Sequence, residues 1–224
     1  MLALLLKLGF WQMERAHAKE RLQAAFAASS ATPAVPIAAL DPSDPATHYR
    51  RVILQGRYDT EHQILLDNQI HQGQPGYHVY TPFIAVGMVQ SILINRGWLP
   101  LGRSRQDVPD VTVTDTTLTL AGRIGQPANP GIRLASPTGE SPWPRIVQYL
   151  DYAELSAALG YPLVPAVILL DPDSPQGYLR DWRPSFGGFG PERHYAYAVQ
   201  WFALALTLMV IVVVLFGKRA RSAC

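Results

Sequence analysis

The stretch YAYAVQWFALALTLMVIVVVLFG, residues 195–217, decides the fold of this chain because it contains no charged side chain. A helix rises about 1.5 Å per residue, so the run would be roughly 33 Å long, enough to cross a bilayer core. A helix buried in a soluble core is the alternative, but such helices rarely have so apolar a circumference as residues 204–216. The run therefore predicts a transmembrane helix.

Basic residues directly after this run predict the orientation of the chain. Lys218, Arg219 and Arg221 lie together at the C-terminus. The positive-inside rule places residues 218–224 as a basic tail in the cytoplasm or in its organellar equivalent. The main body of the chain is then expected on the outer side of the membrane.

The N-terminal segment MLALLLKLGF, residues 1–10, is also apolar except for Lys7. About ten residues span only half of a bilayer, and no A-x-A-like cleavage site follows promptly. We therefore expect residues 1–22 to contain a truncated first transmembrane helix and a juxtamembrane helix. A cluster of basic residues, Arg15, Lys19 and Arg21, would then lie just outside the membrane.

The central part of the chain has the pattern of a β-rich domain. Residues 23–47 are rich in Ala, Ser and Pro and predict a linker, whereas residues 48–186 contain short β-like runs separated by Gly, Pro, Asn and Asp. The expected strands lie at 49–59, 63–68, 76–83, 89–99, 117–125, 145–151 and 166–172. One helix is expected at 151–160, with Leu155 and Leu159 on one face and Gly160 as its stop.

The predicted fold class is thus a membrane-anchored α+β protein. Its mostly antiparallel β outer domain carries one short helix and is flanked by transmembrane helices, the first apparently truncated. Residues 187–217 form the hinge and the C-terminal transmembrane helix in this scheme, and Pro191 and Glu192 suit the first turn of that helix.

Composition excludes several classes of function. The net charge of +2 comes from the C-terminal cluster, so no nucleic-acid-binding face is expected. Cys224 is the single cysteine, which excludes an intrachain disulfide and a Cys-based zinc or copper site. No GxSxG motif is present, and His62, His71 and His78 lack metal-ligand spacing. We expect these histidines to be solvated or locally hydrogen-bonded, and we assign no catalytic residue.

The segment NRGWLPLGR, residues 95–103, joins a strand end to a turn and a large aromatic residue. A structural role accounts for it without any ligand: Trp98 would cap the domain core, and Arg96 would pair with a carboxylate.

His194 stands at the entrance of the long apolar run. On a helix it shares one face with Ala198, Trp201 and Ala205, at i, i+4, i+7 and i+11. The two alanines would let a flat ligand or another helix approach closely. A neutral imidazole there could ligate haem iron, with Arg193 meeting a propionate. From position alone, a simple interfacial histidine is the other interpretation.

Five segments in order resemble the SURF1 (Shy1) family of cytochrome c oxidase assembly proteins. They are LGFWQMERAHAK at 8–19, YRRVILQGRYD at 49–59, GYHVYTPF at 76–83, INRGWLP at 94–100 and PERHYAYAVQWFALA at 191–205. That family has two transmembrane helices flanking an outer domain, which matches the layout above.

The resemblance implies a non-enzymatic assembly factor for haem-copper oxidase that handles haem a for subunit I. The family's histidine at the start of its second membrane helix matches His194, so the resemblance favours His194 as axial ligand of the haem iron, with Arg193 and Trp201 beside it. The implied partners are cytochrome c oxidase subunit I, the haem a synthesis machinery and membrane lipid, with no nucleic acid. The chain is short and shows no targeting presequence, which favours a bacterial inner membrane, crossed more than once, with the main domain in the periplasm.

Two other functions stay open from the sequence. One is a haem-free membrane scaffold that stabilises oxidase subunit intermediates, using its small-residue faces and Gln200 to pack against their helices. The other is a membrane-tethered hydrolase, which would need a nucleophile and a base clustered in the outer domain.

Overall fold

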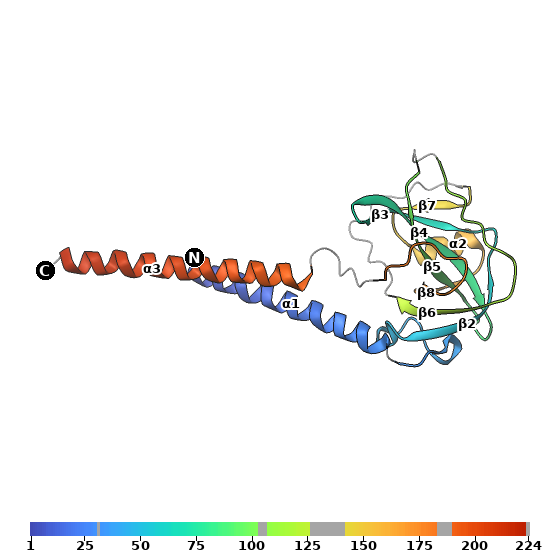
Figure 1. Cartoon of the computed structure of the whole chain (residues 1–224), viewed down its shortest axis with the longest axis horizontal. Coiled ribbons are helices and arrows are strands. Elements are labelled where there is room, and N and C mark those ends of the chain that lie inside the picture. Colours follow the sequence, from blue (N-terminus) through green and yellow to red (C-terminus); the bar gives the residue numbers. More distant parts are fainter. Residues whose placement is uncertain (31, 103–106, 126–141, 183–189, 223–224) are drawn as a thin grey trace. The chain divides into compact units, whose positions relative to one another are not determined.

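The structure, a computed structural model, describes residues 1–30, 32–102, 107–125, 142–182 and 190–222. They form two compact units: a helical unit of residues 1–28 with 183–224, and a domain of residues 29–182. Figure 1 shows the helices of the first unit and the strands of the second.

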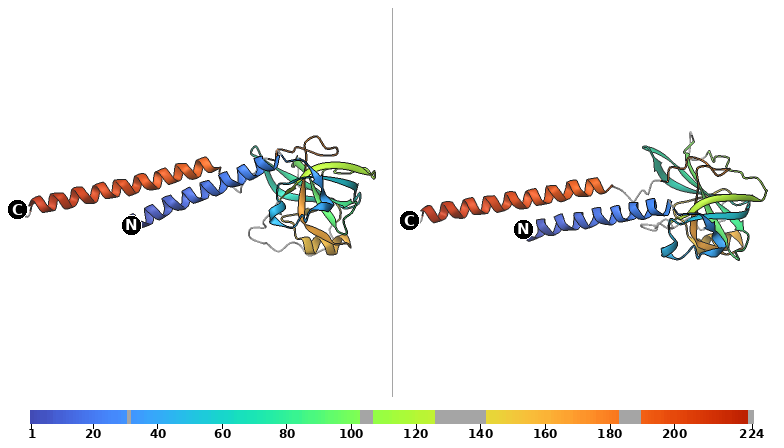
Figure 2. Two further views of the ribbon diagram at one scale, coloured as in Figure 1. Left: turned by 90° about the horizontal axis from the view of Figure 1, so that it is seen from below. Right: turned by 60° about the horizontal axis from the view of Figure 1, so that its bottom comes forward.

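The helical unit is built from α1 (Leu2–Ser30) and α3 (Pro191–Ser222). The two helices lie side by side and run in opposite directions, as the views of Figure 2 agree. Pro191 begins α3 and Glu192 lies in its first turn, as expected, because a proline there loses no hydrogen bond and a carboxylate favours the positive end of the helix. Within the described residues, α3 is the single helix long and apolar enough to cross a membrane, over Pro191–Phe216. A spanning α1 and a two-helix anchor stay predictions.

Residues 23–47, expected as a linker, are organised differently in the structure. Helix α1 continues to Ser30, because alanine is the strongest helix former and dominates residues 23–28. Three short elements follow: β1 (Val35–Pro36), η1 (Ile37–Ala39) and η2 (Pro45–Thr47). β1 pairs with the next strand of the domain, and the side chain of Ile37 is buried in the core. The few apolar residues between the prolines are sufficient to fix this segment to the domain.

The strands of the domain form a closed barrel. They are β2 (Arg51–Tyr58), β3 (Ile64–His71), β4 (Gln74–Ala85), β5 (Ser91–Pro100), β6 (Leu118–Gly125), β7 (Arg145–Val147) and β8 (Leu163–Leu170). The order across the sheet is β1-β2-β6-β8-β5-β4-β3-β7, and β2 also pairs with β4, which closes the ring β2-β6-β8-β5-β4. Most of these pairings are antiparallel, whereas β1 with β2, β3 with β7 and β5 with β8 are parallel. The predicted β-rich domain is confirmed.

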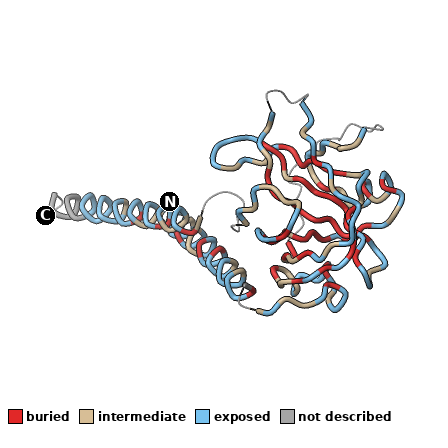
Figure 3. Tube along the Cα trace, turned by 45° about the vertical axis from the view of Figure 1, so that its right-hand side comes forward, coloured by how far each residue is buried: buried red, intermediate tan, exposed pale blue. Residues whose placement is uncertain are grey.

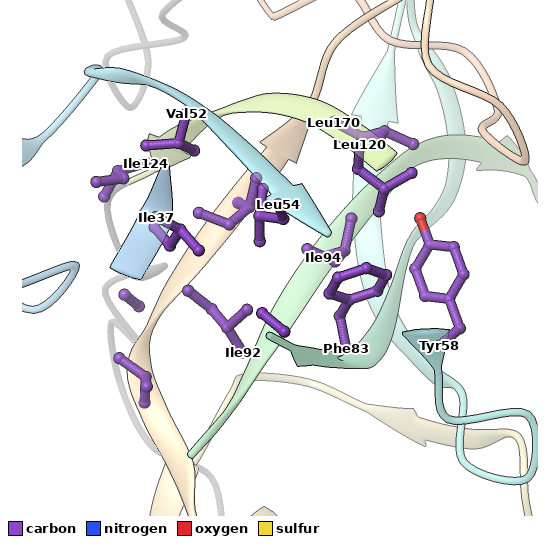
Figure 4. Packing of buried hydrophobic residues seen from close by; sticks show 14 residues of the cluster. Ile37, Val52, Leu54, Tyr58, Phe83, Ile92, Ile94, Leu120, Ile124 and Leu170 are labelled. Atoms are coloured by element: carbon purple, nitrogen blue, oxygen red, sulfur yellow. The ribbon is translucent and has the colours of Figure 1, made fainter. Parts of the chain in front are cut away.

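Alternation along the strands places one set of apolar side chains inside the barrel. In β2 every second residue from Val52 to Tyr58 is buried, which is the period of a strand with one face in a core. Figure 3 shows the buried stretches concentrated along the strands. The interior cluster contains large side chains from β2, β4, β5, β6 and β8, including Leu54, Phe83 and Ile94 (Figure 4).

The predicted short helix is confirmed as α2 (Tyr152–Leu159). The Asp151 carboxylate caps its start by accepting hydrogen bonds from the amides of Ala153 (3.0 Å) and Glu154 (3.1 Å). Gly160 ends it with a left-handed φ of 78°, which residues with a Cβ rarely adopt. Leu155 and Leu159 are buried in a second apolar cluster against β3, β4, β5 and β8.

Candidate functional site

His194 and Gln12 are brought together by the pairing of α3 with α1. The Nδ1 atom of His194 lies 2.7 Å from Oε1 of Gln12. An amide oxygen can only accept a hydrogen bond, so Nδ1 carries the proton in this arrangement. In the neutral ring, Nε2 then keeps its lone pair and is the nitrogen that can bind a metal.

The predicted face around His194 is in contact with another helix for part of its length. Ala198 and Ala205 are 3% and 2% exposed, whereas His194 and Trp201 are half-buried. Neighbouring side chains of α3 contact α1: the Tyr195 hydroxyl donates to Glu20 Oε1 (2.9 Å), and the rings of Phe202 and Phe10 pack edge to face. The small residues therefore serve a helix contact, and His194 and Trp201 remain the part of this face that a ligand could still reach.

Positive charge from α1 surrounds the histidine. Arg15 and Lys19 are both close enough to His194 to act on it electrostatically. The side chain of Lys19 is buried and that of Arg15 is exposed, and Arg193 on α3 is also exposed. Arginine and lysine side chains in this arrangement are the groups that pair with ligand carboxylates.

The residues present fit a haem group better than a bare metal ion. Within the described residues no cluster of three or more His, Cys, Asp or Glu side chains could hold a metal. A porphyrin supplies four of the iron's ligands itself and needs one imidazole from the protein, held by a second group and flanked by cations. His194, Gln12, Arg15, Lys19 and Arg193 provide that set.

The sequence predicts His194, Arg193 and Trp201 as candidate site residues, which stay predictions, and it does not single out Gln12. A signal was present, because Gln12, Arg15 and Lys19 are spaced i, i+3 and i+7 and form one stripe on a helix. The sequence did not show that this stripe faces the start of α3.

Within the part of the chain that the structure describes, Arg96 is held by backbone carbonyls and aromatic rings instead of the predicted carboxylate. Arg96 is 2% exposed, and its guanidinium donates to the backbone carbonyls of Gln176 (Nε, 2.7 Å) and Val111 (Nη1, 2.7 Å). It also lies over the rings of Tyr58 (5.7 Å) and Tyr178 (5.0 Å). Carbonyl oxygens and aromatic faces both carry negative potential, so they satisfy the buried cation without a carboxylate. Arg96 ties three segments of the domain together.

The other residues of the NRGW segment are also structural. The Asn95 side chain accepts from the Gly97 amide (3.1 Å) and donates to the Tyr80 hydroxyl (3.0 Å) and to His78 Nδ1 (3.3 Å). Trp98 is buried, as expected of a residue that caps the core, and its Nε1 donates to the carbonyl of Gln69 (2.8 Å).

The histidines of the domain have local partners. His78 accepts at Nδ1, so its proton is on Nε2, and burial lowers the pKa of His78 to about 4. His62 Nδ1 lies 2.7 Å from Asp59 Oδ2, which also accepts from the Tyr161 hydroxyl. The His71 ring packs 5.2 Å from that of Trp98. The expectation of locally bonded histidines is confirmed for His62 and His78.

Comparison with known proteins gives one consistent family. The model of the SURF1 family matches residues 1–206. A SURF1-like protein of Rickettsia felis is 27% identical over 221 residues, covering 94% of this chain and 91% of that protein. A SURF1-like protein of Mycobacterium bovis is 25% identical over 206 residues, covering 88% of this chain and 72% of that protein. The cytochrome oxidase assembly protein SHY1 of Saccharomyces cerevisiae is 31% identical over 94 residues, covering 41% of this chain and 24% of SHY1.

Proposed function

Because this chain belongs to the SURF1 family, with a match over residues 1–206, we propose that it is an assembly factor for haem-copper cytochrome c oxidase. The name of the yeast relative supports the assembly role, and the bacterial relatives support action in a bacterial inner membrane. The long apolar stretch of α3 is consistent with that location. The family is not a known enzyme class, and the proposal assigns no catalytic residue.

The finer part of the proposal is that the protein holds haem a on its way to subunit I of the oxidase. The observation that carries it is the hydrogen bond of 2.7 Å between His194 Nδ1 and Gln12 Oε1. With the proton on Nδ1, the lone pair of Nε2 is available to bind iron. Metal-binding histidines commonly have their second ring nitrogen held by a neighbouring group in this way. When bound, the haem supplies the iron and two propionates.

Side chains near His194 orient the group in this proposal. Arg193, with Arg15 and Lys19 of α1, would pair with the carboxylates of a bound haem, and the half-buried ring of Trp201 would supply an apolar surface for it. Handover to subunit I, and contact with the machinery that synthesises haem a, follow from the proposed cargo.

The test is the haem content of the full chain expressed with the enzymes of haem a synthesis. The wild type should purify with a haem a spectrum, and His194→Ala should lose most of the absorbance. His71→Ala is the matched control, because it removes a half-buried imidazole from the barrel and should leave the spectrum unchanged. Equal haem content in the wild type and His194→Ala would refute the ligand role.

A haem-free scaffold is the second candidate function. It is favoured by the exposed apolar residues at the C-terminal end of α3, Val210–Phe216, which offer a surface for the helices of an oxidase subunit. This function predicts that the protein co-purifies with subunit I. It also predicts that the chain, purified alone or with subunit I, carries no haem of its own.

A further inference from the structure

We propose that Gln12 is a positioning residue that selects the tautomer of His194, so that α1 prepares the nitrogen with which α3 binds iron. The inference rests on the proposed haem function and deepens it. Gln12 is half-buried on α1, and its amide oxygen faces the imidazole at 2.7 Å across the helix pair.

The polarity of the contact determines what the ring can do. With Nδ1–H donating to the amide oxygen, the lone pair of the neutral ring is on Nε2. The reverse contact, with an amide N–H donating to Nδ1, would leave Nε2 protonated and unable to bind a metal.

The same chain contains an example of the reverse contact. His78 in the barrel also meets a side-chain amide, but there the Asn95 Nδ2 group donates to Nδ1 at 3.3 Å. The orientation of that amide is fixed, since Asn95 Oδ1 accepts from the Gly97 amide at 3.1 Å. His78 is thus held in the form that cannot ligate through Nε2, and His194 is held in the form that can.

The location of Gln12 makes the site depend on both helices. The ligand stands on α3, whereas the group that selects its tautomer and two of the nearby cations, Arg15 and Lys19, stand on α1. Neither helix alone contains a complete site. The proposed haem site therefore forms only when α1 pairs with α3.

The first experiment titrates the full chain in detergent micelles with ferric protoporphyrin IX. Gln12→Leu keeps the approximate volume but removes the acceptor, and it should weaken binding about 10- to 100-fold, as loss of an outer-shell partner typically does. Gln12→Glu keeps an acceptor and makes the imidazole more basic, so it should retain binding and shift the midpoint potential of the bound haem downward. Gln23→Leu is the same exchange at an exposed position of α1. It should match the wild type in affinity for ferric protoporphyrin IX and in midpoint potential.

The second experiment needs no haem. Ring ¹⁵N spectra of the full chain, with His194 identified by its loss in His194→Ala, should show the proton on Nδ1 in the wild type. Gln12→Leu should move the proton toward Nε2. Recovery of the wild-type tautomer in Gln12→Glu would separate loss of the acceptor from disruption of the helix pair.

The outcomes distinguish this inference from the function on which it rests. A wild type that binds no haem but shows Nδ1–H on His194 would refute the haem proposal and support the role of Gln12. Binding through His194 that is unchanged in affinity, potential and tautomer by Gln12→Leu would overturn the role of Gln12 and leave the haem proposal standing.

Discussion

At the scale of single residues, the polar side chains of the barrel are held by groups that are distant in sequence. Arg96 donates to carbonyls of residues 111 and 176, and Asp59 accepts from Tyr161, so no local pattern identifies either partnership. The sequence predicts a carboxylate partner for Arg96, whereas the partners in the described part of the domain are backbone carbonyls. The backbone carries acceptors everywhere, and only the fold shows which of them converge.

The Asp59 carboxylate predicts a specific acid dependence of stability. Burial alone would raise the pKa of Asp59, but hydrogen bonds from Tyr161, His62 and the Glu61 amide outweigh it and hold this pKa below its ordinary value. The stabilisation is therefore complete above the unfolded-state pKa of about 3.9 and is lost as the pH falls through the lower folded-state pKa. Asp59→Asn should cost about 1–2 kcal/mol near pH 7, where a charged acceptor is lost.

The measurement is the free energy of unfolding of the full chain in micelles at several pH values, from urea titrations followed by tryptophan fluorescence. The difference between the wild type and Asp59→Asn should shrink below about pH 4, where the carboxylate begins to be protonated. Asp115→Asn, at an exposed position, should leave the loss of stability in acid as it is in the wild type. A difference between the wild type and Asp59→Asn that grows as the pH falls below about 4 would contradict the assignment.

At the scale of elements, the helices were the easier part to predict. α2 is bounded by Asp151 and Gly160, whose capping contacts are with residues within one helical turn. α3 is predicted by its long uncharged run. Closure of the barrel could not be predicted in the same way, because it depends on the pairing of Gly56 in β2 with Ala85 in β4. These residues are distant in sequence, and no local pattern indicates that they pair. The role of Gln12 was not predicted for the same reason. Gln12, Arg15 and Lys19 form one stripe on α1, but the contact of this stripe with α3 depends on the register of two helices far apart in sequence.

Gly9 lies at the α1–α3 contact. A Cβ at this position would lie 2.6 Å from the ring of Phe202, so the ring must move to admit a larger side chain. Gly9→Leu should therefore weaken the helix pair by about 1–3 kcal/mol, the usual cost of overpacking.

Cross-linking of Glu20→Cys to Tyr195→Cys with a short bis-maleimide reports this pairing, because the tips of the two native side chains meet at 2.9 Å and the removed side chains leave a gap that a linker can span. With Cys224→Ser as background, the cross-linked fraction should fall sharply when Gly9→Leu is added. Ala18→Leu, at an exposed position of the same helix, is the control and should leave the yield unchanged. Undiminished cross-linking in Gly9→Leu would show that the Phe202 contact is dispensable.

At the scale of the whole molecule, the predicted layout places the barrel and the C-terminal tail on opposite sides of the membrane. Lys218, Arg219 and Arg221 follow the apolar stretch and favour the cytoplasm. Reporter fusions after Arg105 and after Cys224 should therefore report the periplasm and the cytoplasm, respectively. Alkaline phosphatase and green fluorescent protein give complementary signals for the two sides. Activity of the same reporter at both positions would refute the layout.

Closure of the barrel also limits how the domain can meet a partner. The sheet that contains it ends in β1 and β7, of two and three residues, so among the described strands little backbone is left for an incoming strand to pair with. A long open edge would be a template for strand addition. Such an edge promotes aggregation with any incompletely folded, hydrophobic polypeptide nearby. In the proposed assembly role, we therefore expect contacts with other proteins to use loops and side chains and not an added strand.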